Sequence, residues 1–357
     1  MKSYLLCNTT LTASLLLCGA ACRADLPPLS PTAVASGAQI SRAYGQEFVT
    51  VGAPGSAPYA GGQGGVNAGS GGVAAPFRIA RTEVTNTQWV DFANAYLPHI
   101  QGDPGRQWGI LGSMFVQFDS GLGRYVVDAG AEQYAASMSW RMAARYCNWL
   151  CNDQRTGAAA FENGAYDTST FGSGPSRTFT DQITHNPGAQ FYLPTRDQWV
   201  KAAFYDPNRN IAGQGGYWTY PNASDRELRY GFPQDGGESI VGLDHIPPFS
   251  WYLPVGSYAN TQSPWGLFDL SGGSCDWNED FNDGRSVRLF SGTERRDAVP
   301  WASDSLYYSS GSAVFPDELF TISGLRVAAV VPSPSTLTAL FAVGIFGVTS
   351  RKRLNRE

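Results

Sequence analysis

Apolar residues recur at helical spacing in three stretches of this chain, and a helix-capping residue precedes each stretch. Thr85 and Thr195 are each followed three residues later by a glutamine, Gln88 and Gln198, which is the pattern of a capping box. Ser139 is a suitable cap for the middle helix. The apolar stripes contain Trp89, Phe92, Ala93 and Tyr96, then Trp140, Ala143, Ala144, Cys147, Leu150 and Cys151, and finally Trp199, Ala202 and Ala203. We predict three helices, with these tryptophans, Trp149 and Trp277 in the core.

The rest of the chain consists of short runs between turn-forming residues. The 41 glycines and 22 prolines among 357 residues favour many turns and little long helix. Residues 48–51 predict a first strand, whereas residues 61–75 and 152–190 predict loops. The aromatic content of 13% is enough for a substantial core. We predict an irregular α+β fold with small mixed sheets, in one domain over residues 47–329 that follows a linker at 25–46.

Charge and cysteine usage narrow the function classes. A net charge of −5 gives no basic surface for nucleic acid, so we expect no nucleic-acid partner. Cys7, Cys18 and Cys22 lie near the start, and Cys275 stands alone. The six cysteines are therefore not the disulfide framework of a small secreted domain. The closely spaced pair at positions 147 and 151 is expected to be two small buried thiols or a labile pair.

The first 24 residues have the pattern of a secretory signal peptide. Lys2 precedes an apolar run over residues 11–21, and Ala24 is a small residue at the expected cleavage position. A membrane anchor is the alternative, but the run is short for a span. Lipoprotein processing at Cys22 is a further alternative.

The C-terminal end resembles a sorting signal. Pro332 and Pro334 precede an apolar stretch at residues 336–350, and the basic residues Arg351, Lys352, Arg353 and Arg356 follow it. Residues 331–357 resemble the PEP-CTERM signal, which implies processing by an exosortase-like sorting machinery. A plain C-terminal membrane anchor is the alternative. In either case we expect an exported protein at the cell surface, outer membrane or extracellular matrix of a Gram-negative-type bacterium.

Five short segments occur in the order typical of one protein family. They are 77–86 (FRIARTEVTN), 138–140 with 146–150 (MSW and YCNWL), 192–199 (YLPTRDQW), 254–257 with 266–277 (PVGS and GLFDLSGGSCDW) and 324–328 (GLRVA). Together they resemble the formylglycine-generating enzyme, or sulfatase-modifying factor, family. The resemblance implies a variant of the C-type-lectin-like fold. It also implies a copper-dependent oxidase that converts a substrate cysteine into formylglycine with oxygen.

The cysteines that this activity implies are missing from the sequence. Family oxidases bind copper through two cysteines near the C-terminal end, yet residues 285–325 contain none. Because Cu(I) prefers soft thiolates, serines cannot replace them, so we predict that copper is not a cofactor. The histidines His99, His185 and His245 show no helical metal-ligand spacing. We predict a ligand-binding or surface protein with no catalytic residues, and the alternative is an oxidase or other metal-dependent modifying enzyme with an altered site.

Two groups of residues remain as candidate sites. By the resemblance, Asp269, Gly272, Ser274 and Asp276 imply a structural calcium site, and the alternative is a glycine-rich turn whose aspartates cap backbone amides. Trp301, Tyr307 and Tyr308 occupy the region of the family's substrate site. Aromatic residues beside polar groups suit a polysaccharide or peptide ligand, and core packing is the alternative.

Glu279, Asp280, Asp283 and Asp297 form an acidic neighbourhood in the sequence. Paired carboxylates can act as acid and base, but we favour a solvated acidic loop.

Overall fold

The computed structural model describes residues 38–61, 65–243, 252–293, 305–306, 309–319 and 323–332. Across these ranges no helix is long and apolar enough to cross a membrane. The predicted signal peptide at 1–24 and the predicted membrane segment at 336–350 lie outside them.

The three predicted helices are confirmed. They are α1 (Asn86–Tyr96), α3 (Trp140–Cys151) and α5 (Arg196–Phe204), and both capping boxes form. In α5, the Thr195 hydroxyl accepts a hydrogen bond from the Gln198 amide, and the Thr195 amide donates to the Gln198 side chain. Single helical turns add α2 (Trp108–Leu111) and α4 (Ala159–Glu162), which are too short to show a helical period in the sequence.

The strands form two larger sheets and two separate hairpins. The five-stranded sheet has the order β1 (Ile40–Ala43), β2 (Gln46–Val51), β3 (Phe77–Ala80), β13 (Ala328–Val330) and β6 (Phe191–Tyr192). The four-stranded sheet has the order β11 (Ser310–Val314), β10 (Arg288–Ser291), β9 (Cys275–Phe281) and β12 (Ser323–Gly324). The hairpins are β4 (Val116–Asp119) with β5 (Arg124–Val127), and β7 (Tyr205–Ile211) with β8 (Gln214–Tyr217). Short 3₁₀ turns lie at Leu97–His99, Pro104–Arg106, Thr168–Thr170, Pro175–Arg177 and Pro233–Asp235.

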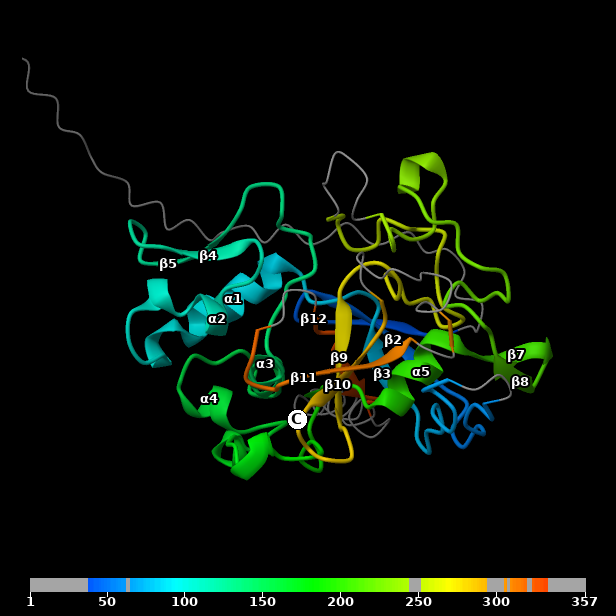
Figure 1. Ribbon diagram of the computed structural model, residues 1–357, viewed down its shortest axis with the longest axis horizontal. Coiled ribbons are helices and arrows are strands. Elements are labelled where there is room, and N and C mark those ends of the chain that lie inside the picture. The colour runs from blue at the N-terminus through cyan, green and yellow to red at the C-terminus, as the bar shows by residue number, and fades with distance from the viewer. Residues whose placement is uncertain are drawn as a thin grey trace, which may run out of the picture.

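The strand predicted at 48–51 is confirmed as part of β2, and the linker at 25–46 ends earlier than expected. Residues 40–43 form the edge strand β1, which pairs antiparallel with β2 from Ile40–Val49 to Ala43–Gln46. Most of the described residues between β2 and β3 and between α3 and β6 lie outside helices and strands, as predicted. The predicted irregular α+β architecture is therefore confirmed (Figure 1).

The core lies between the sheets and the three long helices. One cluster gathers α1 and α3 around Trp89 and Trp140, and the other gathers α5 and β2 around Trp199. Figure 1 shows α1 and the β4–β5 hairpin on one side of the sheets and α5 with β7–β8 on the other. The five tryptophans expected in the core are buried. Cys147 is a buried free thiol and Cys151 is a partly buried one, so these two are not bridged to each other.

Candidate acidic cavity

A buried arginine gathers acidic side chains from segments that are far apart in the sequence. Arg326, between β12 and β13, is fully buried, and its Nε donates to Asp276 Oδ2 at 2.9 Å. Its Nη2 lies 3.3 Å from Glu83 Oε2, in the turn between β3 and α1. The same guanidinium donates to the carbonyls of Ala80 and Phe268. One arginine therefore joins β3, β9 and the loop that precedes β9.

The carboxyl groups around Arg326 outnumber the single positive charge of its guanidinium. Within the described part of the chain, neither oxygen of Glu83 accepts a hydrogen bond, although Oε2 pairs with Arg326 and Glu83 is only 1% exposed; Asp276 Oδ1 likewise accepts none. Burial raises the pKa of Glu83 well above its ordinary value. Burial also raises the pKa of Asp269 to about 6, against the opposing effect of the Gly256 amide and Arg326. Buried carboxylates with unsatisfied oxygens are costly, so this cluster is suited to a further positive group.

Glu83 and Asp269 line a small cavity of about 40 Å³ that opens to solvent. Its other walls are largely aromatic and aliphatic, with Tyr134, Tyr252, Tyr258, Ile240, Leu253, Pro254 and Val255, and the serines Ser257, Ser271 and Ser274 add hydroxyl groups. The Tyr134 and Tyr252 rings stack with centroids 6.1 Å apart, and Phe115 packs edge-on against both. The cavity thus combines an acidic patch with an aromatic wall, which is a common composition for a small-ligand site.

The turn that closes the acidic side depends on special backbone conformations. Asp269 has a φ of 55°, in the left-handed region that aspartate and asparagine tolerate better than most residues. Its carboxylate accepts a hydrogen bond from the Gly256 amide. A Cβ atom at Gly273 would lie 3.0 Å from Glu83 Oε1, so this glycine leaves room for the carboxylate.

The structure brings together three of the four residues predicted to bind calcium. Asp269, Gly272 and Ser274 line the cavity, whereas Asp276 lies behind it and binds Arg326 and the Trp199 indole. Within the described ranges, no three His, Cys, Asp or Glu side chains are placed to hold a metal. Since calcium takes about six to eight oxygens, most ligands here would have to be backbone carbonyls or water. Calcium therefore remains a prediction.

Sequence reasoning missed Glu83 as a site residue. Its place in the segment 77–86 marked it only as part of a family motif. Its role depends on Arg326, which is remote in the sequence. The sequence offers one indication of a site role, which is an isolated acidic residue just before a predicted helix. A favourable interaction with the helix N-terminus explains such a residue equally well.

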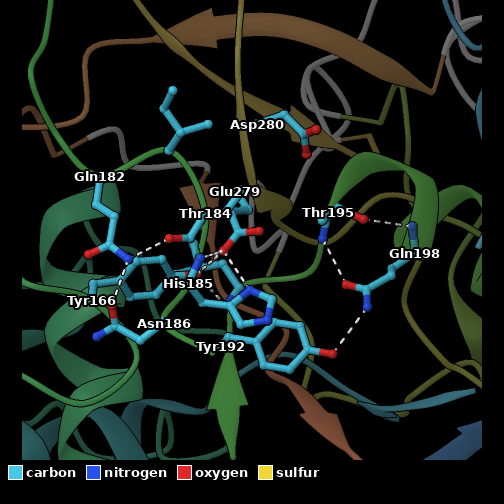
Figure 2. A network of polar contacts seen from close by, with 12 residues as sticks. Tyr166, Gln182, Thr184, His185, Asn186, Tyr192, Thr195, Gln198, Glu279 and Asp280 are labelled. Carbon is cyan, nitrogen blue, oxygen red and sulfur yellow. Dashed lines mark hydrogen bonds and ion pairs between the residues drawn. The ribbon is translucent and has the colours of Figure 1, made fainter. Parts of the chain in front are cut away.

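The predicted solvated acidic loop is wrong for Glu279, which is 2% exposed on β9. Its Oε1 accepts hydrogen bonds from the Tyr166 hydroxyl and the His185 amide and lies 2.8 Å from His185 Nδ1 (Figure 2). The His185 ring stacks on Tyr192 at a centroid distance of 3.8 Å. The prediction failed because the carboxylate satisfies buried donors from the loop before β6.

The other acidic residues differ in environment. Asp280 accepts from the Arg196 amide at the start of α5, Asp283 is exposed, and Asp297 lies outside the described residues. The ligand candidates Trp301, Tyr307 and Tyr308 also lie outside the described residues.

The described cysteines are free thiols in buried or partly buried positions. Cys147, Cys151 and Cys275 are free thiols, and burial raises the pKa of Cys147 well above its ordinary value. Burial raises the pKa of Cys151 too. The Cys275 thiol lies 3.7 Å from the Gly292 carbonyl oxygen. Buried free thiols pack as small apolar side chains.

One family model matches most of the chain, and three solved structures are similar to it. The model of the sulfatase-modifying factor enzyme 1-like domain matches residues 48–328. Treponema denticola variable protein 1 has a TM-score of 0.51 and 16% identity, over 82% of this chain and 99% of that one. PvdO from Pseudomonas aeruginosa has a TM-score of 0.42 and 14% identity, over 82% and 98%. CarF has a TM-score of 0.45 and 20% identity, over 72% and 88%.

No protein of curated function matches the chain. The likeness to the Treponema protein supports the fold alone because the identity is low. The few helices, small sheets and long loops are those of the irregular C-type-lectin-like fold predicted from the sequence.

Proposed function

Because this chain belongs to the sulfatase-modifying factor enzyme 1-like family, we propose that it is a binding member that lacks the copper oxidase site. The acidic, aromatic-walled cavity beside Asp269 is its ligand site. The protein is exported through the leader at 1–24. The tail at 331–357, handled by an exosortase-like machinery, holds it at the cell surface or in the extracellular matrix.

One observation carries this proposal. The family oxidases need two cysteines near the C-terminal end, and residues 285–325 of this chain have none. The nearest cysteine in sequence is Cys275, whose side chain lies in the core on β9. A single core thiol supplies neither the second ligand nor the open access that a Cu(I)–thiolate oxidase requires. The cavity beside Asp269, in contrast, has unsatisfied polar groups and an aromatic wall.

We predict no formylglycine formation by the purified protein. It is incubated with a cysteine-containing sulfatase peptide, Cu(I) and oxygen, and the peptide is analysed by mass spectrometry. Unmodified cysteine is expected because the chain lacks the paired thiolate ligands. A family oxidase with its cysteine pair serves as the positive control. Formylglycine that accumulates with time would overturn the proposal.

Calcium bound at Asp269, with Gly272 and Ser274, is a structural part of the proposal. A ligand that binds only the folded protein stabilises it, by about 2.7 kcal/mol at 100 times its Kd. We therefore expect calcium to raise the melting temperature and a chelator to lower it. Magnesium at equal concentration is the control, because its ligand geometry is stricter. An unchanged melting temperature in calcium and in chelator rejects this part.

An enzyme with an altered site is the second candidate, and the His185–Glu279 pair is the observation that favours it. A carboxylate on Nδ1 fixes a histidine ring and leaves Nε2 available as an acid or base. The His185 side chain is 27% exposed, so solvent reaches it. If the peptide assay shows modification, His185→Ala tests this pair: lost turnover with an unchanged melting temperature would assign the activity to it.

A further inference from the structure

The cavity has carboxylates with unfilled hydrogen-bonding capacity on one side and tyrosine rings on the other, and no role has yet been given to this combination. Glu83 is 1% exposed, and neither of its oxygens accepts a hydrogen bond within the described residues. Glu83 forms an ion pair with Arg326, which also pairs with Asp276. Asp269 faces the same cavity with one hydrogen bond, from the Gly256 amide. No Lys, Arg or His is among the described residues that line the cavity, and none of the lining hydroxyl groups donates a hydrogen bond to Glu83.

The remaining walls select among possible cations. Tyr134, Tyr252 and Tyr258 present ring surfaces, and Ile240, Leu253 and Val255 present aliphatic surfaces, none of which ligates a metal ion. Aromatic faces attract cations, and apolar walls favour a ligand with a hydrocarbon part. A protonated primary amine has three N–H donors for the carboxylates and an alkyl chain for the walls.

We propose that the cavity binds a primary alkylammonium group, with its nitrogen at Glu83 and Asp269 and its alkyl chain against Tyr134 and Tyr252. A quaternary ammonium has no N–H donor and leaves the Glu83 oxygens unsatisfied. The ammonium group competes with calcium for the Asp269 carboxylate, and a bare divalent ion leaves the apolar walls unused. This inference rests on the proposed function because it takes the cavity to be the ligand site.

The test is calorimetric titration of the full protein with n-butylammonium and with n-butanol, its uncharged analogue of similar length. We expect butylammonium to bind at least about tenfold more tightly, the ratio expected for a hydrogen bond to a charged group. Tetramethylammonium is expected to bind less tightly than butylammonium. Nα-acetyl-lysine methylamide and cadaverine then distinguish a lysine side chain from a free polyamine. Equal binding of butylammonium and butanol, or binding of calcium alone, overturns the proposal.

Two variants locate the site. Asp269→Asn keeps the left-handed turn and an acceptor for Gly256 while it removes a charge, so the protein is expected to remain folded. We expect it to weaken butylammonium binding at least about tenfold and to leave butanol binding unchanged. Glu83→Gln is expected to do the same, with its melting temperature recorded as the folding check. Asp283→Asn, at an exposed position, is the matched control.

These results separate the two proposals. Unchanged butylammonium binding in a folded Asp269→Asn variant rejects the ammonium site. Formylglycine in the peptide assay instead rejects the proposed function, whatever binds in the cavity.

Discussion

Replacing Arg326 by leucine is expected to lower the free energy of unfolding by about 3–5 kcal/mol, because it leaves buried carboxylates without a counter-ion. The guanidinium is fully buried, binds Asp276 at 2.9 Å and pairs with Glu83 at 3.3 Å. It also donates to two backbone carbonyls, at Ala80 and Phe268. Leucine fills similar space but satisfies none of these groups. Urea unfolding at pH 7 measures the loss.

Two further variants test the cause of that loss. Arg42→Leu removes an exposed arginine whose pair with Glu47 lies at the surface, and we expect a cost of about 0–1 kcal/mol. Adding Glu83→Gln and Asp276→Asn to Arg326→Leu is expected to recover part of the stability, because it removes the unpaired charges. A loss below about 1 kcal/mol in Arg326→Leu would contradict the role given to this arginine.

Asp269→Asn is expected to stabilise the empty protein at pH 7 by on the order of 2 kcal/mol. The folded protein raises the pKa of Asp269 from 3.8 to about 6, chiefly through burial, so folding favours the protonated form. A rise of about two in the pKa corresponds to about 3 kcal/mol, and we lower this figure because the side chain is partly exposed and solvent screens its charge. Asparagine avoids the cost of ionisation.

The stabilising effect of Asp269→Asn depends on pH. Between the ordinary pKa of 3.8 and the folded pKa of about 6, the folded protein holds more protons than the unfolded chain. The contribution of Asp269 to stability is therefore present below pH 4 and is lost as the pH rises to about 6. The difference in the free energy of unfolding between wild type and Asp269→Asn should increase as the pH rises across this range, in buffer free of amines and divalent cations. Asp283→Asn is the control, and a pH-independent difference would contradict the account.

Local patterns in the sequence were enough to predict the long helices. Capping boxes at Thr85 and Thr195 involve residues three apart, and the apolar stripes that follow repeat every turn. The strand at 40–43 was missed because its pairing with β2 depends on a neighbouring strand more than on its own side chains. Single turns such as α4 are too short to show a period.

The candidate site was only partly predictable from the sequence. The turn at Asp269 was predicted from the family resemblance, whose motif covers this contiguous segment. Glu83 belongs to a distant segment, and only the fold places it beside that turn. The environment of Glu279 was mispredicted for the same reason, since its donors His185 and Tyr166 come from a remote loop.

The most direct test of the central claim is the metal content of the purified protein, measured by elemental mass spectrometry. The account predicts neither copper nor iron at one atom per chain, because residues 285–325 lack the cysteine pair and no three His, Cys, Asp or Glu side chains of the described residues are placed to hold a metal. Calcium at up to one atom per chain is compatible with a binding protein. Copper or iron at one atom per chain would contradict the account and would favour an enzyme with a different set of metal ligands.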